Sequence, residues 1–166
     1  MNLKNRKNID RIKEMALNRY HGCHDNRFDV NGPEHWKRVW QNAQLLIPIT
    51  HANATVVELF CFLHDCCRIH AGHEPEHGHA AERFIQQHEK EFSFLDETEY
   101  QLLLTACGEH THLNRSEDMT IATCWDANRL DLGRLGISPK AQFLMTEAAK
   151  NLEFIHRDIQ SSTDVK

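Results

Sequence analysis

The run ATVVELFCFLHDCCRIH at residues 54–70 carries apolar side chains on almost every side of a helix. A helix of this kind is typical of the centre of a bundle rather than its surface. His64 and Asp65 stand next to each other inside this run. A buried carboxylate without a partner is costly, so such groups are neutralised, paired or bound to a metal. The run therefore predicts a central buried helix with a polar partner or a cation beside His64 and Asp65.

The remaining segments also have the apolar spacing of helices, and the sequence contains no alternating strand pattern of useful length, no internal repeat and no linker. Beyond 54–70, the predicted helical segments are 8–20, 33–47, 79–92, 96–112, 118–135 and 138–156. Ser138, ahead of Pro139, is expected to cap the last of these. We predict an all-α, compact, bundle-like globule of about six to eight helices. Residues 1–160 are expected to form one domain, with 161–166 as a frayed tail.

Composition narrows the classes of function. The 166 residues are 40% apolar and carry a formal net charge of −5. A net negative charge gives no extended positive electrostatic potential of the kind that accompanies nucleic-acid or anionic-membrane binding. It favours a small-molecule partner. The first residues, MNLKNRKNIDRIK, lack the apolar run of a signal peptide, and no window reaches the length of a membrane span. We therefore expect a cytoplasmic protein that binds neither nucleic acid nor membrane. The sequence does not indicate the oligomeric state.

The cysteine and histidine contents lead to different expectations about metal binding. The six cysteines contain no CxxC pair, so buried free thiols are expected rather than a thiolate metal site. The thirteen histidines are an unusual number, and many of them fall between residues 64 and 79. Imidazole is a common ligand of divalent metals, so this bias indicates metal binding before any motif is considered.

Two further residues are candidates to complete a site around His64 and Asp65. His35 lies in the first turn of the predicted helix 33–47, whose apolar face would turn that first turn inward. Asp126 follows a largely apolar stretch and is either a ligand or the partner of Arg129, three residues later.

The order of His35, then His64 and Asp65, then Asp126 resembles the HD superfamily of metal-dependent phosphohydrolases, over roughly residues 30–150. The segments GPEHWKRV, HEPEHG, EHTH and CWDANRLDLGRLGI are similar to a small single-domain bacterial branch of that superfamily. Asn128 departs from this branch, whose segment often reads Asp-Ala-Asp-Arg. The resemblance implies an HD-like helical domain in which the four residues bind a metal.

Members of the superfamily with two metals have additional histidines between the His-Asp pair and the final aspartate. His77 and His110 stand at the matching places, which implies a second metal with Asp65 as the bridging ligand. His79 and His112 are the alternatives to them. His77 is preferred to His79 because it precedes Gly78 at a predicted junction of loop and helix, where a close approach is easy.

The chemistry expected of this ligand set is hydrolysis. Imidazole and carboxylate ligands suit one or two divalent ions, and the set does not discriminate among Mn, Fe, Co, Ni, Mg and Zn. The expected reaction is attack of a metal-bound hydroxide on a small phosphate ester, nucleotide or phosphodiester. Asp65 is the expected catalytic ligand. Arg68, one turn after it, is either a contact to the phosphate or a helix-end arginine that bonds the final carbonyls.

Two other functions remain open at this stage. Some members of the superfamily hold two irons and cleave C–C or C–P bonds oxidatively. The domain could instead be a non-catalytic module that binds a metal or a nucleotide.

Overall fold

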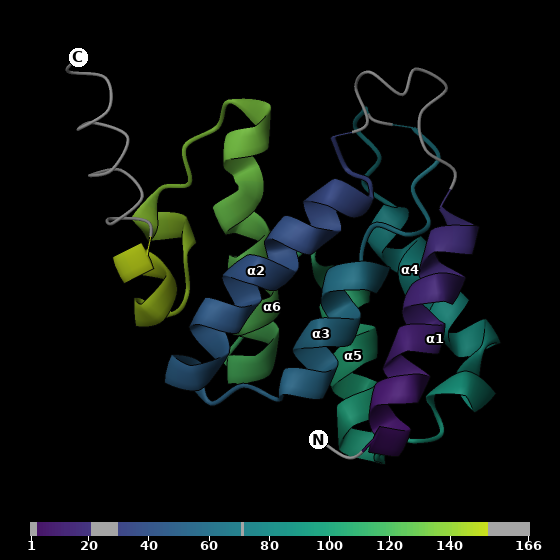
Figure 1. Cartoon of the computed structure of the whole chain (residues 1–166). Helices are drawn as coiled ribbons and strands as arrows, with labels where there is room; N and C mark the ends of the chain where they lie inside the picture. The colour runs from purple at the N-terminus through teal and green to yellow at the C-terminus, as the bar shows by residue number, and fades with distance from the viewer. Residues whose placement is uncertain (1–2, 21–29, 71, 153–166) are drawn as a thin grey trace.

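The computed structural model describes residues 3–20, 30–70 and 72–152, and in these ranges the chain is helical with no strand. The expectation of an all-α, bundle-like fold is confirmed (Figure 1). The α-helices are α1 (Leu3–Arg19), α2 (Pro33–Thr50), α3 (Ala54–Leu63), α4 (His77–Gln87), α5 (Glu97–Glu109) and α6 (Met119–Leu130). Short 3-10 helices are η2 (Glu89–Phe92), η3 (Asp131–Leu135) and η4 (Ala141–Phe143). The predicted tail 161–166 lies outside the described residues.

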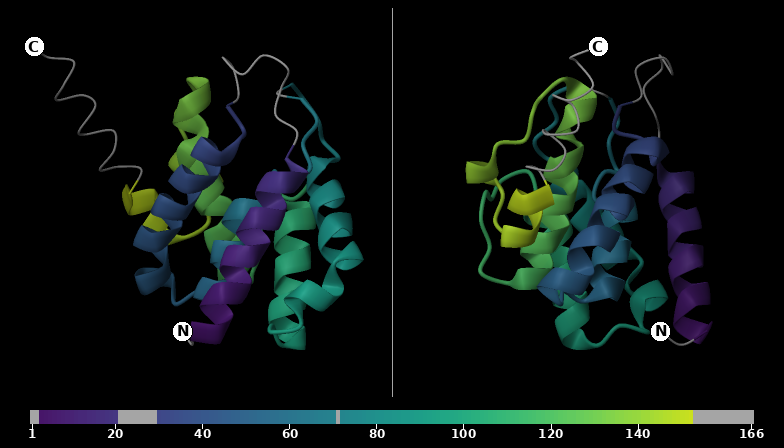
Figure 2. Two further views of the ribbon diagram at one scale, coloured as in Figure 1. Left: turned by 45° about the vertical axis from the view of Figure 1, so that its right-hand side comes forward. Right: turned by 60° about the vertical axis from the view of Figure 1, so that its left-hand side comes forward.

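Helix α3 is the centre of the bundle, as its apolar sequence predicts. It packs against α1, α2, α5 and α6, and α4 packs against α5. The right-hand view of Figure 2 shows α1 along one edge of the bundle, with α6 toward the opposite edge. In α3, all residues from Val56 to Cys61 are buried. Burial on every side explains why this helix needs no polar face.

Side-chain caps fix where several helices begin. The Asn53 side chain accepts hydrogen bonds from the second and third backbone amides of α3, and Asp118 does the same for α6. Asp96 and Glu99 form a reciprocal capping box at the start of α5. Pro33 is the first residue of α2, where its fixed φ suits a helix start. Each cap satisfies amides that lack a partner within the helix.

Helix α3 ends earlier than predicted. It stops at Leu63, and residues 64–67 form a turn instead of continuing the helix to residue 70. The turn is held by hydrogen bonds from the Cys66 amide to the Leu63 carbonyl and from the Arg68 amide to the Asp65 carbonyl, each 3.1 Å. Cys66 and Cys67 after the helix are also buried, so the apolar pattern continues past the end of the helix and hides it. His64 is therefore the C-cap of α3.

The prediction of a continuous helix over residues 138–156 is also wrong at its N-terminal end. Residues 141–143 form η4, and α-helix begins again only at residue 147. Thr146 caps this segment by accepting a hydrogen bond from the Ala149 amide at 3.1 Å. The amides of Met145 and Thr146 are bound by the Asp126 carboxylate, which holds this part of the chain away from a continuous helix. The predicted segments 79–92 and 118–135 are likewise each divided, into α4 and η2 and into α6 and η3.

Aromatic side chains and thiols occupy the core. Trp36 and Trp125 are buried, and their indole N–H groups donate to the carbonyls of Asn31 and Ala106, both at 2.9 Å. The five cysteines in the described ranges are buried and free, which confirms for them the expectation of packed thiols.

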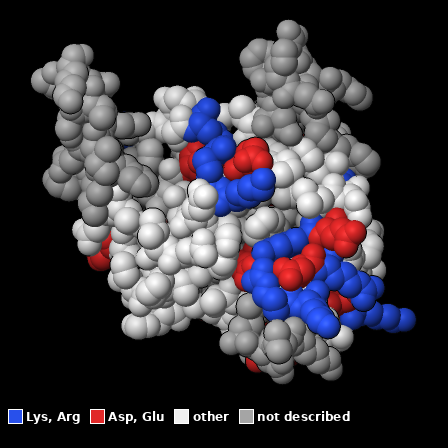
Figure 3. Space-filling view, viewed as in Figure 1, with Lys and Arg blue, Asp and Glu red and all other residues white. Residues whose placement is uncertain are grey.

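Charges of both signs share the surface. On the face shown in Figure 3, Lys and Arg atoms adjoin Asp and Glu atoms in both charged areas. The buried Glu58 of α3 binds the partly exposed Arg6 and Lys13 of α1 at 2.8 and 2.5 Å and so attaches α1 to the central helix. Within the described residues, no helix combines the length and the apolar character needed to cross a membrane.

The ends of several helices meet at one end of the bundle, at the top of Figure 1. The first turn of α2, the first residue of α4, the C-caps of α3 and α5 and the beginning of η3 all carry a histidine or an aspartate. At this end of the bundle, five of the sequence-predicted site residues come together: His35, His64, Asp65, His77 and His110.

Candidate metal centre

Four histidines surround the buried carboxylate of Asp65. The Asp65 Oδ2 atom lies 3.7 Å from His35 Nε2 and 3.6 Å from His64 Nε2. The Asp65 Oδ1 atom lies 2.9 Å from His77 Nε2 and 3.8 Å from His110 Nε2. The five residues form two groups with metal-binding spacing that share Asp65. We call these five residues the inner centre.

The first pair of histidines is oriented by acceptors on the outer side of each ring. His35 Nδ1 lies 2.6 Å from Asp131 Oδ2, and His64 Nδ1 lies 3.1 Å from the Phe60 carbonyl oxygen. Because a carbonyl oxygen only accepts, the hydrogen of neutral His64 is on Nδ1, and an ionised Asp131 fixes the same tautomer in His35. The two Nε2 lone pairs then face each other at 3.2 Å. A cation between them would satisfy both nitrogens.

The second pair has the same arrangement. His110 Nδ1 donates to the Cys107 carbonyl at 2.7 Å, and His77 Nδ1 contacts the Glu74 carbonyl. The Nε2 atoms of His77 and His110 are 2.9 Å apart. His77 has one additional neighbour, because Arg68 Nη1 lies 2.8 Å from its Nδ1 and 3.2 Å from its Nε2. With the His77 hydrogen on Nδ1, toward the Glu74 carbonyl, the second pair can also present two nitrogens to one ion.

Burial sets the charge states of the inner centre. It lowers the pKa of His35 and His110, and it lowers the pKa of His64 well below its ordinary value. Burial alone would raise the pKa of Asp65, but the surrounding His64 and His110 hold it well below its ordinary value. Neutral His35, His64 and His110 beside an ionised Asp65 are in the protonation states in which such groups bind metal.

Asp126 lies outside both groups of the inner centre. Its carboxylate accepts hydrogen bonds from the Met145 amide at 2.9 Å and from the Thr146 amide and hydroxyl at 2.7 and 2.9 Å. Arg129 Nη1 is 4.0 Å away, at the limit of an ion pair. Burial raises the pKa of Asp126. In this structure Asp126 joins α6 to the segment that follows η4.

Asp131 contacts the inner centre through His35 and was not predicted from the sequence. Besides its contact with His35, it accepts a hydrogen bond from Arg38 Nε at 2.7 Å. Arg134 lies beside it, with Nη1 3.7 Å from Asp131 Oδ2, and donates to the Val30 carbonyl at 2.7 Å. These contacts orient the His35 ring. The available signal was a second carboxylate in the segment DANRLD, five residues after Asp126.

A close approach of α4 and α5 brings the second pair of histidines together. A Cβ atom on Gly78 would lie 2.7 Å from the Gly108 carbonyl, 2.9 Å from the Cys107 carbonyl and 3.1 Å from His110 Nδ1. Real Cβ atoms are not found at such distances from a backbone oxygen. The absence of a side chain at Gly78 thus allows His77, next to it, to reach His110.

The two alternative histidines form a separate, more exposed group. His79 and His112 lie with Glu76 in a third cluster of metal-binding spacing, and their rings stack at a centroid distance of 4.5 Å. We call Glu76, His79 and His112 the outer group. The structure therefore brings His77 and His110 to Asp65 and places His79 and His112 elsewhere.

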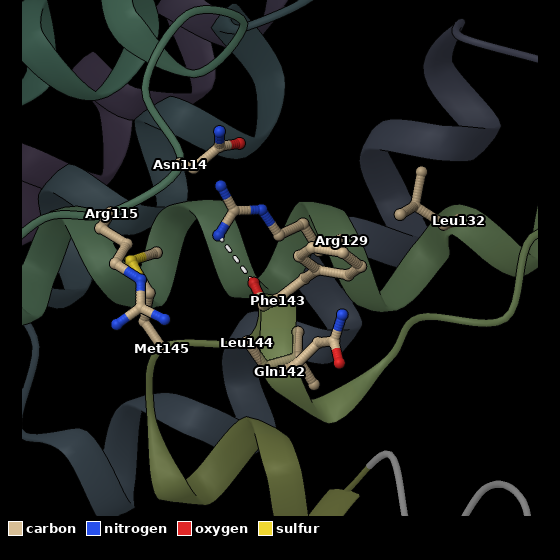
Figure 4. Close-up of a pocket in the computed structure, with 8 residues that line it drawn as sticks. All are labelled: Asn114, Arg115, Arg129, Leu132, Gln142, Phe143, Leu144 and Met145. Atoms are coloured by element: carbon tan, nitrogen blue, oxygen red, sulfur yellow. Dashed lines mark hydrogen bonds between the residues drawn. The ribbon is translucent and has the colours of Figure 1, made fainter.

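A cavity of about 570 Å³ lies between the end of α6 and the segment around η4 (Figure 4). Its lining includes Asn114, Arg115, Arg129, Gln142 and Phe143. Arg129 donates to the Phe143 carbonyl at 3.0 Å, the bond drawn in the figure. The inner centre contributes no residue to this lining.

Comparisons with family models, with curated proteins and with solved structures found no match to this chain. A helical fold in which His and Asp side chains gather in groups that can hold a metal is compatible with an HD-type domain.

Proposed function

We propose that the protein is a metal-dependent phosphohydrolase of the HD type, acting on a small phosphate ester, nucleotide or phosphodiester. The observation that carries this proposal is the convergence of four imidazole Nε2 atoms on the two oxygens of one buried carboxylate. When the hydrogens of the neutral rings are on their Nδ1 atoms, no hydrogen lies between the nitrogens of the pairs at 3.2 and 2.9 Å, so a cation is the natural partner of each pair.

In the proposed centre, His35, His64 and Asp65 Oδ2 would hold one divalent ion, and Asp65 Oδ1, His77 and His110 would hold a second. Two such ions activate water and neutralise charge on a phosphoryl group when both are bound. The protein's part is to aim the imidazoles, which the acceptors at the Nδ1 atoms do, while burial favours the neutral forms of His35, His64 and His110. Asp65 is the residue common to both positions, so both depend on it.

Arg68 is the proposed phosphate contact. Its side chain is buried beside the inner centre, with Nη1 3.9 Å from Asp65 Oδ1, and Nη2 donates to the Gly72 carbonyl at 2.7 Å. Within the described part of the chain, its Nε atom is buried without a hydrogen-bond partner. A fixed guanidinium with a free donor next to the centre is suited to developing phosphoryl charge.

Oxidative cleavage with two irons is the second candidate. The four imidazoles and the shared carboxylate that favour hydrolysis with Mn or Co also suit iron. The two candidates differ in their consumption of oxygen and in their products, so a single preparation can distinguish them.

The test is elemental analysis of tag-free protein purified without chelator, followed by a phosphatase screen. The substrates are p-nitrophenyl phosphate, its bis ester and nucleoside monophosphates, each with Mn, Co, Ni, Mg or Fe. We expect bound metal and phosphate release in the wild type, and Asp65→Asn should lose phosphate release and the metal of the inner centre. His73→Asn, which changes an exposed histidine outside both groups, should retain both.

Three outcomes would contradict the proposal. Protein that takes up no metal under any loading condition would remove its basis. Phosphate release that persists in Asp65→Asn would assign the activity to another site or to a contaminant. Bound iron with oxygen consumption and no phosphate release would favour the second candidate, and bound metal without any turnover would favour a binding module.

A further inference from the structure

The outer group combines two imidazoles and a carboxylate on two adjoining segments. His79 Nδ1 lies 3.1 Å from Glu76 Oε2, and His112 Nε2 lies 3.6 Å from Glu76 Oε1. Each residue offers one ligand atom, and these atoms lie within 4.8 Å of one another. Glu109 adds a further carboxylate, with Oε1 3.6 Å from His79 Nε2. This spacing is small enough for one ion to contact all three members of the group.

The fold places the two histidines side by side from two different segments of the chain. His79 belongs to the first turn of α4, and His112 follows the end of α5. Their rings are nearly parallel, with an interplanar angle of 17°. Thr111 strengthens the contact between the segments by donating its hydroxyl hydrogen to the Pro75 carbonyl at 2.7 Å. The fold thus holds together the two segments that carry His79 and His112.

We infer that Glu76, His79 and His112 form an outer binding site for a borderline divalent ion such as Zn²⁺, separate from the inner centre. Two imidazoles and one glutamate are a known ligand set for zinc, with remaining positions open to water. Glu109 would accept a hydrogen bond from the His79 ring and keep it oriented. Because the set contains nitrogen ligands, Zn²⁺, Ni²⁺ and Cu²⁺ should bind better than Mg²⁺ or Ca²⁺.

Exposure distinguishes the outer site from the inner centre. The side chains of His79 and His112 are 31% and 34% exposed, whereas that of Asp65 is 4% exposed. An ion at the outer site is therefore reached directly from solvent and should exchange rapidly. The outer site also lies on the two segments that carry His77 and His110, each two residues away in sequence. A bound ion there would hold these two segments against each other.

The test is equilibrium dialysis of the full chain against micromolar Zn²⁺, with metal counted by elemental analysis. The variant is the double substitution His79→Gln and His112→Gln. The matched control is His73→Gln with His88→Gln, two histidines outside the outer group and the inner centre. We expect the variant to bind one equivalent of zinc fewer than the wild type, and the control to bind as many as the wild type. Equal numbers of equivalents in variant and wild type would overturn the inference.

A second measurement keeps the inference testable if the double variant folds poorly. In the wild type, the inner centre is first filled with metal and more zinc is then added. The ring-nitrogen NMR signals of His79 and His112 should shift during this second addition. Unchanged signals at saturating zinc would overturn the inference. Neither readout requires phosphatase activity. If the wild type has no phosphatase activity but the double variant still binds one equivalent of zinc fewer than the wild type, the outer site is supported and the proposed function is contradicted.

Discussion

The Nδ1 atom of His35 lies 2.6 Å from the Oδ2 atom of Asp131, in a buried contact between the first turn of α2 and the start of η3. Asp131 is itself held by Arg38 and Arg134. Burial alone would raise the pKa of Asp131, but the hydrogen bonds from His35 and Arg38 hold it below its ordinary value. A charged acceptor at Nδ1 makes the Nε2 of His35 a better metal ligand.

The first prediction concerns this contact. Asp131→Asn should weaken metal binding at the inner centre by roughly 10- to 100-fold, the usual effect of losing an acceptor behind a metal-binding histidine. The measurement is metal affinity by competition with a chromogenic chelator. Asp131→Glu should recover part of the affinity if the carboxylate acts through His35. Unchanged affinity in Asp131→Asn would show that the contact does not orient a ligand.

Asp126→Asn is the matched comparison, because it changes the other carboxylate of the same segment. In the structure Asp126 bonds to Met145 and Thr146, so this variant should lower the free energy of unfolding and leave the metal content unchanged. Loss of metal in Asp126→Asn would instead support the sequence-based prediction that Asp126 is a ligand.

These two aspartates show how far the sequence could predict the site. The central helix, the burial of His64 and Asp65, and the meeting of His77 and His110 at Asp65 follow from apolar spacing, histidine content and the resemblance to a known family. Asp126 and Asp131, in contrast, differ by five residues, or roughly 140° around a helix. Only the packing of α6 against its neighbours decides which of them faces His35. The C-terminal end of α3 could not be predicted from the apolar pattern either, because buried residues continue beyond it.

The second prediction uses the close approach at Gly78. Gly78→Ala should separate α4 from α5, because its Cβ would meet two backbone carbonyls at less than 3 Å. We expect destabilisation of about 1 to 3 kcal/mol, typical of an overpacked site, and weaker binding of the metal held by His77 and His110. Denaturant unfolding and metal counting measure both effects. Gly133→Ala is the control, since nothing lies within 4 Å of its Cβ position. Equal stability of the two variants would contradict the prediction.

The third prediction concerns metal removal. A ligand that binds only the folded state at 100 times its Kd stabilises that state by about 2.7 kcal/mol, which for a chain of this length corresponds to roughly 5 to 10 °C in Tm. Adding EDTA to metal-loaded protein should lower the Tm by about that much. Asp65→Asn should show a much smaller response, because both metal positions of the inner centre depend on Asp65. A wild-type Tm that is indifferent to EDTA after verified loading would argue against metal binding at the inner centre.

The fourth prediction separates the role of Arg68 from that of the metal ligands. Arg68→Ala should retain bound metal but raise the KM for a phosphate ester by roughly 10- to 100-fold, since a hydrogen bond to a charged group contributes about 1.5 to 3 kcal/mol. Inhibition by inorganic phosphate should weaken by a similar factor. Arg11→Ala removes an exposed arginine that pairs with Glu91 at 2.8 Å, far along the sequence from the centre, and should change neither quantity. Loss of metal in Arg68→Ala would show instead that its contacts with His77 and Gly72 maintain the ligand geometry, and an unchanged KM with full metal would remove Arg68 from substrate binding.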